Sequence, residues 1–162
     1  MAAQQSSKQL RKLTGLIKRY HYAVAALLLI CMAVMGLGSM RGDSAIVDEV
    51  AHISAGYSYV RYGDYRLNPE HPPLVKDLAA LPLLGLRLTF PLGTGAWQRD
   101  VNGQWEVGWH FLYHDGNNAD QILFWSRLPV LLLTLLFGAV LYEISRRYLG
   151  RAAALVILAL FA

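Results

Sequence analysis

The sequence has few charged residues and a single cysteine. The first shortage argues against a soluble domain, and the second excludes a disulfide within the chain. Charged residues make up 16% of the 162 positions, whereas hydrophobic residues make up 55%. A soluble domain usually carries about 25% charged residues, so the composition favours a membrane protein. The lone Cys31 lies in an apolar run and excludes an intramolecular disulfide. We interpret it as a small packing residue.

The distribution of basic residues gives no indication of a nucleic-acid partner. The net charge is +4, but the lysines and arginines flank apolar runs and form no single patch. The sequence ends inside the apolar run RAAALVILALFA, at 151–162. We therefore expect the N-terminal part of a longer membrane protein, and we expect this part alone to be inactive.

Two apolar segments are long enough to span a membrane, and a third begins near the end. Between Arg19 and Arg41 lie 21 residues without Asp, Glu, Lys or Arg. A helix of about 20 residues covers the ~30 Å hydrocarbon core of a bilayer. We predict transmembrane helices at 22–40 and 124–145, and the start of a third at 152–162. A cleaved signal peptide is the alternative for the first segment, although its apolar part is long for one.

Basic residues predict the orientation of these helices. Residues 1–21 carry five lysines and arginines, and the turn after the second apolar segment carries three. Because such residues stay on the cytoplasmic side, the tail 1–21 is predicted to be cytoplasmic, with its first 12 residues disordered. Residues 41–123 then form one extracytoplasmic loop of a multi-pass protein in the inner or plasma membrane, in contact with membrane lipids. Glu143 is expected to pair with Arg146 or Arg147 on its own helix.

The first part of the loop, about 45–61, has apolar residues at helical spacing and predicts an amphipathic helix at the membrane surface. Asp43 or Ser44 is expected to cap its start, and the glycine of Tyr-Gly-Asp at 62–64 is expected to end it.

A second interfacial helix is predicted at about 73–89. This segment is apolar but contains Lys76 and Asp77. Placing either in the middle of a bilayer would cost about 2.5–3.5 kcal/mol, so a membrane span is excluded. Pro82 is expected to kink the helix.

Ionisable side chains gather on the first of these helices. Asp48 and His52 are four residues apart and Glu49 is three residues from His52, so all three share a face. The simplest interpretation is a solvated face with acids favoured by the helix dipole. The pattern lacks the two histidines of a zinc-protease motif.

The segment RLNPEHPPLVK, 66–76, adds a second group of polar residues. Its prolines restrict the backbone and favour a rigid turn. Glu70, His71 and Lys76 surround the double proline. A carboxylate, an imidazole and an ammonium held beside a membrane suit a charged ligand with a lipid tail.

Together, the Asp48-Glu49 pair and the segment GDYRLNPEHPPLVKDLAALPLL, 63–84, resemble the lipid-carrier-dependent glycosyltransferases of the GT-C fold, in glycosyltransferase family 39. Protein O-mannosyltransferases of this group have an acidic pair after the first transmembrane helix and an HPPLGK motif. The bacterial aminoarabinose transferases of lipid A have EKPPL instead. The resemblance implies an all-α integral membrane protein with GT-C transmembrane helices and two interfacial helices in its first extracytoplasmic loop.

The resemblance also implies an enzyme that moves a sugar from a polyprenyl phosphate to an acceptor hydroxyl outside the cytoplasm. The sugar is a mannose-like hexose or an aminoarabinose-like pentose, and the acceptor is a lipid or a protein. Asp48 would be the catalytic base and Glu49 would orient it or contact the acceptor. Direct displacement would invert the anomeric centre.

Four residues are the candidates for substrate binding: His52, Arg66, His71 and Lys76. Lys76 matches the lysine of HPPLGK and would neutralise a phosphate oxygen. Glu70 and His71 are the candidates for holding a divalent cation, and no cofactor is otherwise expected. His71 stands where the aminoarabinose transferases have lysine, which disfavours lipid A modification.

The rest of the loop holds a second histidine pair and three tryptophans. His110 and His114 are four residues apart and Asp115 is adjacent, a spacing that could bind a metal. The alternative is an ordinary pair of loop histidines. The tryptophans are expected either to stack on a sugar or to settle at the membrane interface: Trp97, Trp105 and Trp109.

Two other functions fit parts of the sequence. One is a non-catalytic transporter or scaffold subunit, although a transporter is expected to place ionisable residues at mid-membrane. The other is a membrane metallohydrolase, which needs three ligands to converge from the loop histidines His52, His71, His110 and His114.

Overall fold

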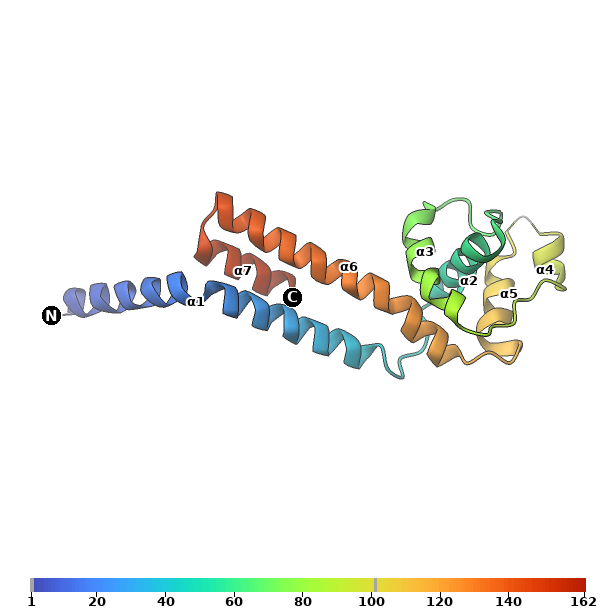
Figure 1. Cartoon of the computed structure of the whole chain (residues 1–162), viewed down its shortest axis with the longest axis horizontal. Helices are drawn as coiled ribbons and strands as arrows, with labels where there is room; N and C mark the ends of the chain where they lie inside the picture. Colours follow the sequence, from blue (N-terminus) through green and yellow to red (C-terminus); the bar gives the residue numbers. More distant parts are fainter. Residues whose placement is uncertain (1, 101) are drawn as a thin grey trace. The chain divides into compact units, whose positions relative to one another are not determined.

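The computed structural model of the chain describes residues 2–100 and 102–162 (Figure 1), with side chains described for residues 15, 16, 19–100 and 102–162. Helices occur throughout these residues and strands do not, which confirms the all-α prediction. The helices are α1 (Ala2–Ser39), α2 (Val47–Tyr62), α3 (Pro73–Ala80), a 3-10 helix (Leu81–Gly85), α4 (Gly95–Gln98), α5 (Gln104–Trp109), a π-helix (His110–His114), α6 (Ala119–Tyr148) and α7 (Arg151–Phe161).

The chain divides into two compact units. The first unit comprises the chain up to Gly36 together with Leu133–Ala162, and the second unit comprises Leu37–Leu132. The first unit therefore holds most of α1, the C-terminal part of α6, and α7. The second unit holds the polar segments in which the sequence places its candidate functional residues.

Two helices are long and apolar enough to cross a membrane, namely α1 over Arg19–Ser39 and α6 over Ala119–Tyr148. Both predicted spans are therefore helical, and α6 extends several residues beyond its predicted bounds at each end. The predicted disorder of the first 12 residues is wrong, because α1 begins at Ala2. This segment contains Ala, Gln and Lys, which favour helix. Four of the basic side chains used to predict orientation lie outside the described side chains: Lys8, Arg11, Lys12 and Lys18.

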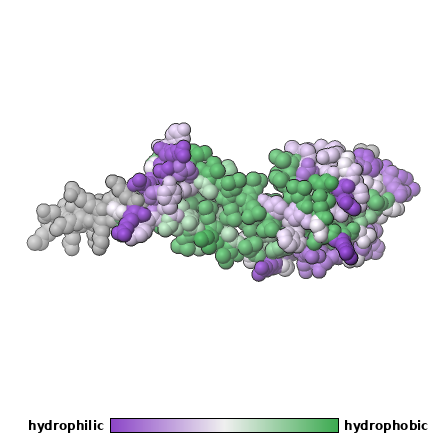
Figure 2. All heavy atoms as spheres, viewed as in Figure 1, coloured by the Kyte–Doolittle hydropathy of each residue, from purple (hydrophilic) through white to green (hydrophobic). Residues whose placement is uncertain are grey.

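The first unit exposes most of its large apolar side chains (Figure 2). Val34, Met35 and Phe137 are 57–69% exposed. Cys31 is also exposed, so its predicted packing role is wrong. Glu143 pairs with both arginines of the last turn of α6, Arg146 and Arg147, at 2.6 and 2.8 Å.

The second unit packs around α2. A single apolar core includes Tyr57 of α2, Phe90 and Phe111, and the ring of Tyr57 stacks on that of Phe111 with centroids 5.0 Å apart. Helix α3 approaches α2 so closely that a Cβ at Gly56 would collide with the backbone carbonyl of Lys76. Glycine at position 56 therefore permits this helix crossing.

Helix α2 confirms the predicted helix but has more than one buried face. Ile53 and Tyr57 are buried on the predicted apolar side, and Ser54 and Ser58 are fully buried beside them. Both serine hydroxyls donate to backbone carbonyls, which makes their burial tolerable. The helix is the centre of a folded unit and is more enclosed than a one-sided interfacial helix.

The ends of α2 give one correction and one confirmation. Neither Asp43 nor Ser44 caps the start, because the helix begins beyond their reach and Glu49 accepts the Ile46 N–H at 3.0 Å instead. The end is as predicted: Gly63 has φ 67° and donates its N–H to the Tyr59 carbonyl at 2.9 Å. A left-handed residue at this place is the common way to end a helix.

The second predicted helix is shorter than expected. α3 ends at Ala80 and is followed by the 3-10 helix Leu81–Gly85, so the helix predicted up to residue 89 is wrong beyond residue 85. Pro82 has no N–H to donate and disfavours α-helix on its N-terminal side. In place of the predicted kink, the chain changes from α-helix to 3-10 helix at this point.

Candidate functional site

The two acids of the Asp48-Glu49 pair have different environments in the first turn of α2. The Glu49 carboxylate accepts two hydrogen bonds of 2.7 Å from the Arg127 guanidinium, on α6. Arg127 also donates to the backbone carbonyls of Asp43 and Ser44. Glu49 therefore fastens the start of α2 to α6 and to the segment that leads from α1.

The electrostatics of the pair follow from these contacts. Burial raises the pKa of Glu49, but the hydrogen bonds from Arg127 and Ile46 outweigh it and hold the pKa below its usual value. Asp48 is exposed, and among the described residues no hydrogen bond engages its carboxylate. One acid is thus neutralised by a cation and the other is open to solvent.

His52 lies one turn after Asp48 and contacts His71 of the proline-rich turn. The two imidazole centroids are 5.1 Å apart. Burial lowers the pKa of His52, and the nearby His71 and Lys76 lower it further. His52 is therefore neutral at neutral pH, so that its ring can accept as well as donate a hydrogen bond.

Lys76 is buried beneath the proline-rich turn. Its ammonium donates to the backbone carbonyl of Asn68 at 2.8 Å, to the Asn68 side chain at 2.6 Å, and to the carbonyl of His71 at 2.8 Å. The Tyr59 hydroxyl lies 3.1 Å away. Burial lowers the pKa of Lys76, while the Asp77 and Glu70 carboxylates oppose the shift. All three ammonium protons are in use, so the phosphate contact predicted for Lys76 would require one of these bonds to break.

An amide network continues from Lys76 to the protein surface. The buried Asn68 side chain donates to the Gln104 side chain of α5, and Gln104 donates to the Glu70 carboxylate at 3.1 Å. The Gln104 hydrogen bond lowers the pKa of the exposed Glu70. Hydrogen bonds from Lys76 and from Gln104 of α5 therefore hold the turn that carries Glu70 and His71.

Arg66 is paired within its own loop. Its guanidinium makes a bidentate contact with Asp64, with bonds of 2.8 and 3.0 Å, and it lies over the Trp97 ring at 5.1 Å. These contacts lower the pKa of Asp64. The side chain is 58% exposed, so its remaining N–H groups are accessible to an anion.

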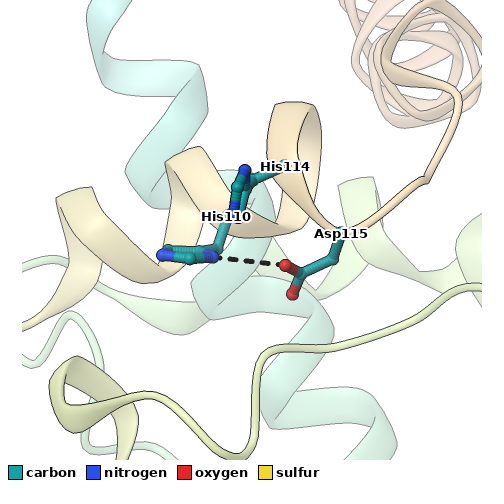
Figure 3. Close-up of side chains that lie close together, drawn as sticks. All are labelled: His110, His114 and Asp115. Atoms are coloured by element: carbon teal, nitrogen blue, oxygen red, sulfur yellow. Dashed lines mark hydrogen bonds and ion pairs between the residues drawn. The ribbon is translucent and has the colours of Figure 1, made fainter.

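Only one group of three possible metal ligands occurs among the described residues, and it is His110, His114 and Asp115 (Figure 3). Glu70 and His71, which the sequence suggested for a cation, belong to no such group of three. No three of the four loop histidines come together either, as a metallohydrolase would require. The pairs His52–His71 and His110–His114 lie on different elements of the second unit.

Sequence reasoning missed Arg127, Asn68 and Gln104. Arg127 interrupts the apolar run of α6, and a charge in such a run is a sign that a partner exists. Asn68 precedes a proline in a turn and reads as an ordinary turn residue. Gln104 has no local pattern that distinguishes it from a surface glutamine.

Comparisons with known proteins identify no relative of the chain. No protein-family model matches the chain, and no match was found among curated proteins or among solved structures.

Proposed function

We propose that this chain belongs to a membrane glycosyltransferase that takes a sugar from a polyprenyl phosphate. In this proposal α1 and α6 cross the membrane, the N-terminus is cytoplasmic, and the second unit faces the extracytoplasmic side. The apolar surfaces of the two helices support the membrane location. The resemblance of the acidic pair and of the proline-rich turn to family 39 supports the reaction.

The observation that carries the proposal is the asymmetry of the acidic pair. A general base needs an accessible carboxylate near the reacting hydroxyl. Asp48 meets this requirement because it is exposed and unengaged, whereas Glu49 is occupied by Arg127. We therefore assign the base to Asp48, and we assign Glu49 a positioning role through its contact with Arg127.

The proposed step is a single displacement. The Asp48 carboxylate takes the proton of the acceptor hydroxyl while the acceptor oxygen forms a bond to the anomeric carbon. The bond between that carbon and the phosphate oxygen breaks, and the polyprenyl phosphate leaves with the electron pair. Attack opposite the leaving group inverts the anomeric centre.

The neighbouring side chains suit the charges of this step. His52 lies one turn after Asp48 on α2, and His71 contacts His52 with ring centroids 5.1 Å apart. The exposed guanidinium of Arg66 is the accessible cation in the proline-rich segment and is assigned to the phosphate. Lys76 contributes by holding the turn, and a divalent cation, if used, would contact Glu70 and His71.

The test is sugar transfer in membranes that contain the protein expressed from its complete gene. The assay follows loss of radiolabelled sugar from a polyprenyl-phosphate pool in wild type, Asp48→Asn and the matched control Glu106→Gln, an exposed acid of α5. We expect Asp48→Asn to reduce transfer by about 10²–10⁴-fold, the usual contribution of a general base, with protein level and donor binding unchanged. Glu106→Gln should transfer at the wild-type rate. Wild-type transfer by Asp48→Asn would refute the assigned mechanism.

A further inference from the structure

We propose that His110, His114 and Asp115 bind one transition-metal ion, with Zn²⁺ as the favoured ion, at a site separate from the acidic pair. The three side chains come from the π-helix and the residue after it, and they turn toward one another (Figure 3). Their ligand atoms all lie within 4.8 Å of one another.

The distances suit a small tetrahedral ion. Zinc binds imidazole nitrogen and carboxylate oxygen at 2.0–2.2 Å, so that two ligands of one tetrahedral ion lie about 3.4 Å apart. His110 Nδ1 and Asp115 Oδ1 share a hydrogen bond of 3.2 Å, which is close to that separation, so a bound ion would take the place of the shared proton. His114 is exposed and can complete the set by a side-chain rotation.

The backbone that carries the ligands is fixed before any ion binds. The Asp115 N–H donates to the His110 carbonyl at 3.0 Å, which closes the wide π-turn and brings the aspartate back over the first histidine. Gly116 follows with φ 78°, a conformation that favours glycine. Between the two histidines, Phe111 and Leu112 are fully buried in the core. The buried pair anchors the turn, and single π-turns of this kind are frequent at functional sites.

A second anchor holds the chain just after the ligands. The Asn117 side chain donates to the carbonyls of Thr89 and Phe111, both at 2.7 Å, and accepts the Thr89 N–H at 2.9 Å. The turn is thereby tied to a distant segment of the second unit. A metal site needs such support, because its ligands must hold their geometry to gain affinity.

The donor set identifies the class of ion. Two imidazoles and one carboxylate suit Zn²⁺, Co²⁺, Ni²⁺ and Cu²⁺, whereas Mg²⁺ and Ca²⁺ prefer oxygen ligands throughout. Three protein ligands leave the fourth position of a tetrahedral ion open to water or to another ligand. Trp109, 50% exposed, stacks on His114 with centroids 5.1 Å apart.

The test uses the purified full chain in detergent, prepared without a polyhistidine tag. Isothermal titration with Zn²⁺ should give one ion per chain. Co²⁺ should give the strong visible absorption of a four-coordinate site. His114→Ala should weaken Zn²⁺ binding by at least about 100-fold, because even groups one step removed from a metal contribute 10–100-fold. The side chain is exposed, so the variant should fold, and circular dichroism checks this.

Two controls make the outcome decisive. Glu106→Gln changes an exposed acid of α5 that has no role in either proposed site and should leave Zn²⁺ affinity within twofold of wild type. Asp115→Asn keeps the shape of the third ligand and should lower affinity while retaining the helical spectrum. The proposal is overturned if wild type binds no Zn²⁺, or if His114→Ala binds it as tightly as wild type. It is equally overturned if Glu106→Gln weakens binding as much as His114→Ala does.

Discussion

The two units of the chain differ in how far their hydrophobic side chains are exposed. In the second unit Phe111, Leu112 and Ile122 have no exposed surface. In the first unit Leu136 and Phe137 of α6 are more than half exposed, at 60% and 57%. Burial of apolar surface from water contributes about 25 cal/mol per Å², but hydrocarbon offers no such gain. The second unit therefore gains stability from burying its apolar side chains, whereas the exposed apolar surface of the first unit agrees with our proposal that α1 and α6 cross a membrane.

Most of the buried polar side chains among the described residues also lie in the second unit. The second unit buries an ammonium and two amides, those of Lys76, Asn68 and Gln104, and joins them by hydrogen bonds. Such a network is stable only while every member is satisfied. The second unit therefore depends on these few side chains, whereas the exposed apolar positions of α1 and α6 should tolerate many substitutions. The four tryptophans lie in the second unit, so their fluorescence reports its unfolding: Trp97, Trp105, Trp109 and Trp125.

The largest expected effect comes from removing a buried phenylalanine ring of the second unit, compared with an exposed one of the first unit. Phe111→Ala deletes a fully buried ring and should lower the free energy of unfolding of the second unit by about 4 kcal/mol. The matched Phe137→Ala removes an exposed ring of the first unit and should change that value by less than about 0.5 kcal/mol. Urea titration in mild detergent, followed by tryptophan fluorescence, measures both. Equal effects of the two substitutions would remove the contrast between the units.

A somewhat smaller loss is expected for Lys76→Met. The methionine keeps the apolar stem but leaves the oxygens of Asn68 and His71 without their donor, at a cost of about 3 kcal/mol in total. The control is Arg61→Met, which removes an exposed cation of α2 and should cost less than about 0.5 kcal/mol. The same urea titration compares them. If Lys76 served only to bind phosphate, its replacement would leave the unfolding free energy unchanged.

The two acids of the pair should differ in their contribution to stability as well as in their contribution to activity. Glu49→Gln loses the ion pair with Arg127 and should destabilise the second unit by about 2 kcal/mol, whereas Asp48→Asn should be within about 0.5 kcal/mol of wild type. Because the pKa of Glu49 is lowered from 4.5, its stabilisation is complete above that pH and is lost as the pH falls below it. The Glu49→Gln variant should lack this part of the acid sensitivity. Comparable destabilisation by both variants would contradict the division of roles.

The smallest effect concerns His52. Its pKa is lowered from 6.5 by burial and by its cationic neighbours, so below that pH the unfolded chain binds a proton that the folded chain resists. Stability therefore falls as the pH drops below 6.5. His52→Gln should show a shallower fall in the unfolding free energy between about pH 7 and pH 5. An identical slope in wild type and variant would mean that His52 titrates normally.

Local sequence patterns predicted much of the secondary structure. The apolar runs gave α1, α6 and α7, the spacing of apolar residues gave α2, and Gly63 gave its end. The errors arose where a local preference met a competing contact. Asp43 and Ser44 are good capping residues, but Glu49 reaches the first N–H of α2 instead. Likewise, Pro82 lies in the 3-10 helix Leu81–Gly85, which follows α3 where a continuous helix was expected.

The sequence predicted part of the candidate site, but not its partners from distant segments or the charge and accessibility of its members. The proximity of Asp48, Glu49 and His52 follows from helical spacing, and the π-turn brings together the His110, His114 and Asp115 group that the spacing suggested. Which acid would be neutralised could not be foreseen.

The sequence by itself determined the helical class, the two long apolar helices and the rigid proline-rich turn, because each depends on residues close together in the chain. Tertiary structure alone decided that Glu49 is neutralised while Asp48 is open, and that Lys76 is enclosed by the turn. The reason is physical: Glu49 meets Arg127 across 78 positions, and Asn68 meets Gln104 across 36. Contacts of this range exist only once the second unit has folded, and they fix the charge and the accessibility of each side chain.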